Sequence, residues 1–440
     1  MLTMKSTPVA LTAKRFPFAR LLFWGVSLLV IILREPRFFT LPRFWAEEGT
    51  LHFAAAFSLP WYQTLFLPQF GYLNFWPNLA AILANLAPLE QAPLVTTLMA
   101  LAAQMTPIIL ILWSRSPIWK GWLFRLAGVA VYLFAALTWE TWLNTTCSYT
   151  IFGLITFLIL LEETPSGAAR RWIYRALLLL AGLTGTLSCF LTPFFAARAF
   201  FEKDKQRWLQ TAILALCTLA HMVIIFSYRD QGNIGDRFNF IGFATLGATL
   251  AAQTFALLAA GLDQASAWGN QLYALTSQNP DQFQLLGRLF LAGEAVLLLL
   301  FSFNLPRMQR FLFLGSFATL LVLPVMFSAI PDKYSFMKTG FHQRTFMPPN
   351  VLMGWMLLFG LRLTRPQKSS TGAGSLARWA CALALAAALF WGIQAYPRSW
   401  GGNAVWPDWK AEVETWRADP AYALRIQPEG WVIQLKTPEK

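Results

Sequence analysis

Long runs of apolar residues constrain this chain more than any other feature, because several of them can cross the hydrocarbon core of a membrane. The segment 92–113 contains no charged residue, and a transmembrane helix needs only about 20 predominantly apolar positions. Hydrophobic residues make up 56% of the chain, charged residues make up 13%, and the mean hydropathy is +0.48. These values lie outside the range of soluble globular domains. The sequence therefore predicts an all-α polytopic membrane protein.

The distribution of Lys and Arg orients the predicted helices. Cytoplasmic loops are enriched in these residues, and Lys5, Lys14, Arg15 and Arg20 precede the first apolar run. We therefore expect a cytoplasmic N-terminus, about eleven transmembrane helices, an extracytoplasmic C-terminus and a location in a plasma or inner membrane. The expected crossings are 18–33, 92–113, 121–139, 147–161, 172–188, 191–201, 208–228, 285–303, 311–330, 347–361 and 378–395.

The transmembrane domain is expected to cover 1–395 and to carry a long external segment, 34–91, after its first helix. In that segment an apolar stretch broken by Pro60 precedes an amphipathic helix over 74–90, and such helices suit the membrane surface. A crossing by 72–88 would place the basic loops that follow it outside. The charge pattern therefore favours surface helices here.

A second external segment is expected over 229–284. Its apolar run 240–262 is interpreted as re-entrant or surface-lying, because a crossing there would reverse the later basic loops. The tail, 396–440, should form a small external cap. It is expected to contain a short helix through Trp416 and a hairpin that turns at Pro428-Glu429-Gly430.

An acidic pair, Glu47 and Glu48, stands out in the first external segment, because the chain has only 21 acidic residues among 440. A tryptophan and a glycine flank the pair at the expected membrane interface. Partial burial there would raise the pKa of a carboxylate toward that of a useful general base. The pair is a candidate general base or metal ligand, and His52 follows about one helical turn later. The alternatives are a solvated loop pair bonded to Arg43 and a histidine that only packs.

Glu140 and a group of cations are the next candidates. Glu140 lies between two tryptophans in a short external loop, where it is either catalytic or part of an interfacial aromatic belt. Three cations, Lys333, Lys338 and Arg344, and a histidine, His342, lie in the last external loop, on the cation-poor side. They favour an anion site, for phosphate especially. Ordinary interfacial anchoring is the alternative. The residues assigned to substrate or phosphate binding are Lys338, His342, Arg344, Arg237 and His52.

Glu294 lies in the middle of an expected span, where carboxylates are rare and commonly functional. The alternative is a protonated glutamate bonded to a neighbouring helix. The chain has no phosphate-cradling glycine loop, no CxxC pair, no HExxH motif and no dinucleotide fingerprint, so soluble nucleotide-dependent chemistry is not expected. The net charge of +14 fits cytoplasmic loops better than nucleic acid, which is not an expected partner.

This order of features resembles the GT-C superfamily of integral-membrane glycosyltransferases. Members have a cytoplasmic N-terminus, an acidic motif in the first external loop, surface helices after it and a long later external loop. The features that match here are Glu47 with Glu48, the segment 51–90, Glu140 and the segment 229–284. The Ala-Glu-Glu-Gly sequence departs from the usual Asp-containing motif. That departure leaves open which glutamate is the base and whether a divalent metal ion binds as cofactor.

The resemblance implies an inverting transfer of a sugar from a polyprenyl-phosphate donor to a hydroxyl of a lipid or glycan acceptor. One glutamate would deprotonate the acceptor, and Arg344 with Lys338 would hold the leaving phosphate. The donor's prenyl chain would remain among the membrane lipids. The rival function is a lipid or glycan flippase or transporter coupled through Glu294, although no internal repeats of the kind common in transporters are evident. A subunit of a surface-polymer assembly is a third interpretation.

Overall fold

The chain folds almost entirely into helices. The computed structural model describes residues 17–136, 138–228, 240–328, 330–339, 342–362, 372–397 and 406–435. Strands within these ranges form only two antiparallel pairs, β1 (Pro68–Gln69) with β2 (Tyr72–Leu73) and β3 (Leu424–Arg425) with β4 (Val432–Ile433). The predicted all-α class is therefore confirmed.

Six helical runs in the described ranges are long and apolar enough to cross a membrane, which supports the predicted membrane location. Two more helices, α7 (Trp122–Leu133) and α8 (Ser148–Leu161), are apolar but shorter. The six runs are η2 (Leu89–Gln91) with α6 (Ala92–Trp113), α11 (Lys205–Ser227), α12 (Phe243–Leu250) with η6 (Ala251–Ala256) and α13 (Leu257–Gln278), α14 (Pro280–Phe301), α15 (Arg307–Met326) and α17 (Gly372–Ala395).

The segment 34–91 is mostly helical, as predicted, and its helices are interrupted at Pro60. The tail contains the predicted short helix and hairpin. The remaining helices are α1 (Pro17–Arg34), α2 (Arg37–Thr40), η1 (Glu48–Phe53), α3 (Ala54–Ser58), α4 (Trp61–Leu65), α5 (Phe75–Asn85), η3 (Pro117–Trp119), α9 (Ala168–Leu183), η4 (Cys189–Leu191), α10 (Thr192–Glu202), η7 (Lys333–Met337), α16 (Gln343–Gly360) and α18 (Trp409–Ala418).

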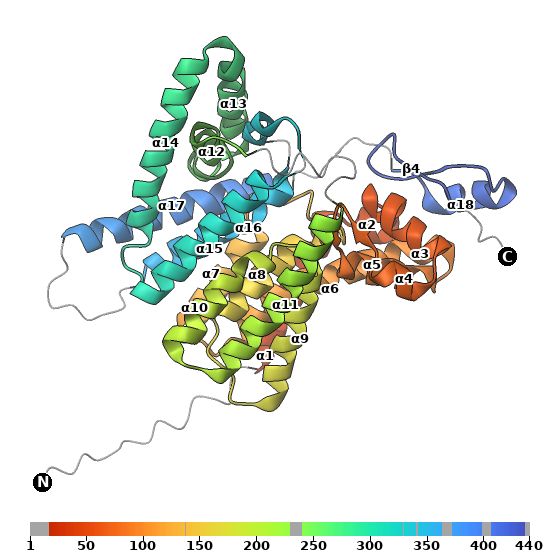
Figure 1. Cartoon of the computed structure of the whole chain (residues 1–440), viewed down its shortest axis with the longest axis horizontal. Coiled ribbons are helices and arrows are strands. Elements are labelled where there is room, and N and C mark those ends of the chain that lie inside the picture. Colours follow the sequence, from red (N-terminus) through yellow and green to blue (C-terminus); the bar gives the residue numbers. More distant parts are fainter. Residues whose placement is uncertain are drawn as a thin grey trace, which may run out of the picture.

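Helix α8 lies at the centre of the bundle (Figure 1). Every side chain of α8 except that of Tyr149 is buried, and the helix packs against α6, α9 and α16. Its 14 residues make it about 21 Å long. Residues that come just before α8 and residues that come just after it therefore lie at opposite ends of one buried helix.

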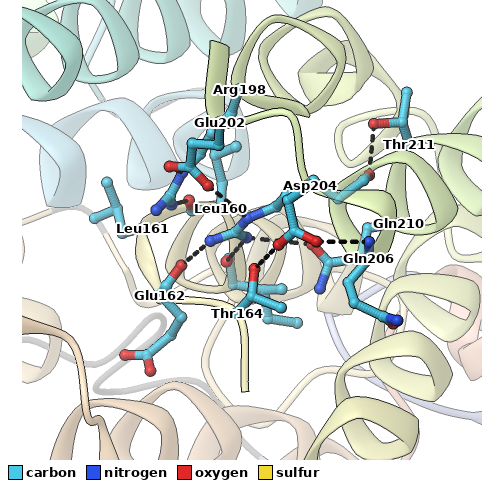
Figure 2. A network of polar contacts seen from close by, with 12 residues as sticks. Leu160, Leu161, Glu162, Thr164, Arg198, Glu202, Asp204, Gln206, Gln210 and Thr211 are labelled. Atoms are coloured by element: carbon cyan, nitrogen blue, oxygen red, sulfur yellow. Dashed lines mark hydrogen bonds and ion pairs between the residues drawn. The ribbon is translucent and has the colours of Figure 1, made fainter. Parts of the chain in front are cut away.

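Two arginines close the C-terminal end of α8 (Figure 2). A helix leaves its last carbonyl groups without partners, and here Arg198 donates to the Leu160 carbonyl while Arg207 donates to the Glu162 carbonyl. Both guanidinium groups also bond the carboxylate of Glu202. Because donors and acceptors are matched, this charged network can be buried without a large electrostatic cost.

The tail and the first external segment share a second hydrophobic core, away from the bundle. Figure 1 shows α2 to α5 beside α18 and β4. The contact requires a glycine at position 49, because a Cβ there would lie 2.5 Å from Cδ1 of Ile433. The predicted C-terminal cap therefore packs directly against the acidic segment. The buried residues of this core are Phe44, Phe53, Ala84, Ala92, Trp409, Val413, Leu424, Ile426, Ile433 and Leu435.

The apolar run 240–262 belongs to a long helical segment from Phe243 to Gln278, which breaks at Gly261, where φ is +80°. Helix α12 packs tightly on α14, because a Cβ on Gly247 would meet the carbonyl oxygen of Gly287. This part of the chain therefore forms a separate group of helices, which Figure 1 shows projecting from the bundle.

The predicted helix 121–139 was too long at its C-terminal end, because α7 ends at Leu133. The residues after it form a compact turn, in which the Thr141 hydroxyl donates to the Thr138 carbonyl and the Thr146 amide donates to Oδ1 of Asn144. Short polar side chains of this kind compete with the helix for backbone hydrogen bonds. The result is a rigid loop immediately before α8.

Candidate active site

The turn that presents the acidic pair has an unusual backbone. Ala46 has a φ of +39°, a region that non-glycine residues occupy rarely and that is enriched at functional sites. The tail holds this turn in place, because the Ala46 amide donates to the Gln427 carbonyl at 2.5 Å and the Gln427 amide donates to the Phe44 carbonyl at 3.2 Å. The conformation of the acidic segment therefore depends on residues almost 400 positions later.

Glu48 faces inward and is only 3% exposed. Its Oε1 accepts hydrogen bonds from the amide and the hydroxyl of Thr145, and its Oε2 accepts from the Trp45 amide at 3.4 Å. Burial raises the pKa of Glu48 above its usual value, and the bonds from Thr145 oppose that shift. This carboxylate ties the acidic turn to the loop before α8.

Glu47, in contrast, is half-buried. It lies within electrostatic reach of Arg344 and Cys147. Glu140 belongs to the same group, because it also interacts electrostatically with both. Of the two adjacent glutamates, Glu47 is the one whose charge acts on Arg344, together with that of Glu140.

Glu140 and Arg344 form an ion pair at the start of α16. Oε2 of Glu140 accepts the Arg344 backbone N–H at 3.2 Å, and Oε1 lies 3.5 Å from Nε of the same arginine. The carboxylate thus caps a helix N-terminus, where negative charge is favourable. The side chain of Glu140 is 17% exposed and that of Arg344 is 35% exposed, so the pair remains open to a ligand.

Arg43 is the most unusual charged group of the site. It is 2% exposed, and its guanidinium carbon lies 4.4 Å from the ring centre of Trp406, 4.5 Å from that of Phe38 and 4.9 Å from that of Trp45. Its Nε has no hydrogen-bond acceptor in the described part of the chain. Burial lowers the pKa of Arg43 to about 9, and the charges of Glu48 and Glu35 oppose that shift.

A pocket separates Arg43 from Glu140. The pocket is a small, partly open hollow. Aromatic rings and charged groups of both signs form its walls. The lining residues are Arg34, Glu35, Phe38, Arg43, Trp45, Trp139, Glu140, Trp142, Asn144 and Trp406.

The other predicted site residues lie apart from this group or outside the described residues. Nζ of Lys338 lies 3.6 Å from the ring centre of Tyr273. Nε2 of His342 is 3.1 Å from the Ser335 hydroxyl. Lys338 thus contacts α13, and His342 contacts η7. Arg237 falls in 229–239, outside the described residues.

His52 packs in the second core and does not join the acidic group. It is 1% exposed, and its Nδ1 is 2.6 Å from Oδ1 of Asn78. Burial lowers the pKa of His52 to about 4, although the bond to Asn78 opposes the shift. The imidazole is therefore neutral at physiological pH, which agrees with the alternative that this histidine packs.

No group of three or more His, Cys, Asp or Glu side chains that could hold a metal ion is present in the residues that the structure describes. The divalent metal ion allowed by the resemblance therefore remains a prediction. The charges of two carboxylates, Glu47 and Glu140, act on Arg344.

The chain was also compared with known proteins. No family model, no curated protein and no solved structure matches it.

Sequence reasoning missed the cationic and aromatic part of the site. The sequence offers Arg43 only as a partner of the acidic pair, and it does not single out Arg34. The one available signal was the pairing of acidic residues with tryptophans, at Trp45 and on both sides of Glu140. Trp406 carries no local signal, because it reaches the pocket only through the packing of the tail.

Proposed function

We propose that this chain is a GT-C-like membrane glycosyltransferase, with about eleven transmembrane helices, a cytoplasmic N-terminus and an extracytoplasmic C-terminus. It transfers a sugar from a polyprenyl-phosphate donor to an acceptor hydroxyl on the extracytoplasmic side, with inversion at the anomeric carbon. The observation that carries the proposal is the ion pair between Glu140, shortly before α8, and Arg344 of α16, on which the charge of Glu47 also acts.

In the proposed step Glu47 is the general base. It takes the proton of the acceptor hydroxyl, and the oxygen uses its lone pair to form a bond to the anomeric carbon. The bond between that carbon and the phosphate oxygen breaks, and the electron pair leaves with polyprenyl phosphate. A half-buried carboxylate with no strong hydrogen-bond donors of its own is better suited to accept a proton than one that is already fully bonded.

Arg344 stabilises the charge that develops on the leaving phosphate. A guanidinium group binds phosphate through two parallel hydrogen bonds, which lysine cannot reproduce. Glu140 is a positioning residue in this proposal, because it caps α16 and fixes the Arg344 side chain. Glu48 is also a positioning residue, since its oxygens are occupied by Thr145 and Trp45.

The experiment is to reconstitute Glu47→Gln and Glu48→Gln variants in lipid with a polyprenyl-phosphate sugar and to measure transfer. Glu47→Gln should reduce turnover by about 10²–10⁴-fold while donor binding and folding are retained, because the amide keeps the shape but accepts no proton. Glu48→Gln is the matched control. It should reduce the yield of folded protein more than the turnover of the folded fraction. Full turnover of a folded Glu47→Gln variant would overturn the assignment of the base.

Arg344→Ala and Arg344→Lys test the phosphate contact. The alanine variant should weaken donor binding strongly, and the lysine variant should recover only part of it, because the bidentate geometry is lost. Unchanged affinity for a lipid phosphate in the alanine variant would remove Arg344 from the site.

One observation favours the rival function of a transporter. Glu294 in α14 is 5% exposed, and neither of its carboxylate oxygens has a partner in the described residues. Intramembrane carboxylates of this kind often couple transport to protons or ions. Glu294→Gln should leave glycosyl transfer unchanged if the chain is an enzyme. Loss of lipid or glycan movement in that variant, with no transfer activity in the wild type, would favour the transporter.

A further inference from the structure

Three segments of the chain meet at the candidate site, and each contains a non-glycine residue in the left-handed region. These residues are Ala46 with a φ of +39°, Leu143 with a φ of +48° and His342 with a φ of +57°. Each lies within three positions of a charged residue of the site. Non-glycine residues occupy this region rarely, and backbone strain of this kind is concentrated at functional sites. It persists only where surrounding contacts hold it, so those contacts are the next question.

Leu143 is the least compatible of the three with its backbone conformation. A leucine has no polar side-chain atom that could stabilise the left-handed region locally, whereas histidine is found there more often. The Leu143 side chain is 3% exposed. Its backbone N–H donates to Oε1 of Gln104 at 3.2 Å, and this hydrogen bond is buried. A single side chain from another helix therefore bonds the backbone at the strained residue.

Gln104 belongs to the long apolar helix α6 and is 2% exposed. It lies twelve residues after the first residue of that helix, about 18 Å along its axis. Membrane lipid offers no hydrogen bonds to irregular backbone at this depth, so the protein must supply them. The Gln104 backbone carbonyl also accepts the Tyr132 hydroxyl at 3.0 Å, which ties the same position to α7.

The loop around Leu143 contacts two other parts of the site. Three positions before Leu143, the Glu140 carboxylate pairs with Arg344 and accepts its backbone N–H. Two positions after it, the Thr145 amide donates to Oε1 of Glu48 at 3.3 Å. Because Glu140 and Thr145 lie on opposite sides of the strained residue, a change of φ at Leu143 would turn one of them away from its partner.

We infer that Gln104 is a positioning residue for the candidate site. Its side-chain oxygen holds Leu143 in the left-handed conformation, and this conformation keeps the two contacts of the loop in place. Gln104 is buried too deeply to touch a substrate, so it acts only through the loop. Its effect on sugar transfer rests on the proposed function, whereas its effect on the contacts of the loop does not.

Hydrogen–deuterium exchange of the full-length protein in lipid nanodiscs tests these contacts without any substrate. Gln104→Leu removes the acceptor at similar side-chain size, so peptides that contain the Thr145 and Arg344 amides should exchange at least about fivefold faster. The matched control is Gln210→Leu, because Gln210 is also a buried glutamine of a long apolar helix but accepts from Arg207 at the opposite end of α8. The control should leave both peptides unchanged. Unchanged exchange of both peptides in Gln104→Leu would overturn the inference.

A second substitution separates positioning from a general loss of stability. Glycine adopts a positive φ without the steric cost of a Cβ, so Leu143→Gly reduces the need for the bond to Gln104. Added to Gln104→Leu, it should bring the exchange of the Arg344 peptide back toward the wild-type rate, although the loss of a buried leucine destabilises the fold. Still faster exchange of that peptide in the double variant would show that Gln104 only stabilises the fold. If Gln104→Leu does not fold, Gln104→Asn tests the same bond, because its shorter side chain moves the oxygen away from Leu143.

Transfer assays separate the positioning role from the proposed function. Gln104→Leu should reduce kcat by about 10–100-fold, because small misplacements of reacting groups are costly, and Leu143→Gly should restore part of the loss. Full turnover of a folded Gln104→Leu variant would overturn the role of Gln104 in transfer and leave the enzyme intact. A wild-type chain that transfers no sugar overturns the proposed function. Faster exchange in Gln104→Leu, reversed by Leu143→Gly, would then still support Gln104 as the residue that positions the loop.

Discussion

The two ends of α8 carry similar residues in very different arrangements. At the C-terminal end, Arg198 and Arg207 bond helix carbonyls and share the carboxylate of Glu202 (Figure 2). At the N-terminal end, Arg43 has no bonded acceptor among the described residues, and Arg344 pairs with Glu140 in a partly open position. One end uses all of its charges to close the bundle. The other leaves charges available beside a pocket.

The difference teaches how to separate structural from functional charge in a membrane protein. Both regions lie at an end of α8 and include residues that are distant from it in the sequence. Both contain glutamate and arginine. Composition alone cannot tell them apart. A network in which each donor has an acceptor stabilises the fold. A buried group that lacks one needs another explanation, such as an ordered water, an ion, local strain or a ligand.

The largest expected effect is on stability at the closed end. Arg207→Met should lower the free energy of unfolding by about 3–5 kcal/mol, because it leaves the Ile159 and Glu162 carbonyls without their donor and removes one of the two guanidinium groups that bond Glu202. Arg43→Met, the same substitution at the open end, removes no hydrogen bond and should cost far less. Unfolding in mixed detergent micelles, followed by tryptophan fluorescence, measures both. Equal losses of unfolding free energy in the two variants would show that the two ends of α8 do not differ in how their arginines stabilise the fold.

A second expected effect is a dependence of stability on pH near the acidic segment. The pKa of His52 is about 4 in the folded protein and about 6.5 when unfolded. As pH falls from 6.5 to 4, the unfolded chain gains a proton that the folded protein does not, so the free energy of unfolding falls by about 3 kcal/mol.

Glu48 acts in the opposite direction, because its pKa is raised and its protonation in the folded state favours folding as pH falls. His52→Asn isolates the histidine contribution, since the amide can retain the bond to Asn78. Unfolding measured at several values between pH 6.5 and 4 should show a smaller acid loss in this variant. If the free energy of unfolding falls equally in both proteins between pH 6.5 and 4, the loss of stability does not come from His52.

The third expected effect concerns the contact between the tail and the acidic segment. Gly49→Ala places a Cβ against Ile433 and should lower the free energy of unfolding by about 1–3 kcal/mol. It should also reduce turnover, because the turn that presents Glu47 would shift. Combining it with Ile433→Val, which removes the clashing methyl group, should recover part of both losses. No recovery would mean that the tail does not position this turn.

The smallest expected effect is at an exposed ion pair between the same two regions. Arg417 lies 2.5 Å from Glu90, and its side chain is 55% exposed. Arg417→Ala should change the free energy of unfolding by only about 0.2–1 kcal/mol, and less at high salt. Thermal unfolding at low and high ionic strength measures this. A large loss would show that charge, rather than packing, holds the tail in place.

Much of the fold could be predicted from the sequence because it follows from local patterns. The apolar run 92–113 forms a helix over nearly the same residues, and the turn Pro428-Glu429-Gly430 joins two strands. The end of α7 was misjudged, because apolar composition continues past Leu133 while polar side chains at 138–146 redirect the backbone. Local hydropathy does not report such side-chain bonds.

The candidate site could be predicted only in part. Glu47, Glu140 and Arg344 were recognised from scarcity and position, but Lys338 and His342 were grouped with Arg344 because they are close in sequence. The structure gives those two residues other partners. The sequence could not predict that Glu48 is buried while Glu47 is only half-buried, because this difference depends on the backbone turn at Ala46.

The sequence by itself determined that this chain is helical, that it belongs in a membrane and that its acidic residues concentrate near one predicted face. Those properties are sums over local residues, and the cost of exposing apolar runs to water fixes them. Only the tertiary structure decided which charges are satisfied. Thr145 bonds Glu48 across 97 residues, and Arg207 reaches the Glu162 carbonyl across 45. Such pairings depend on how the helices pack, as does the absence of an acceptor for Nε of Arg43 in the described part of the chain.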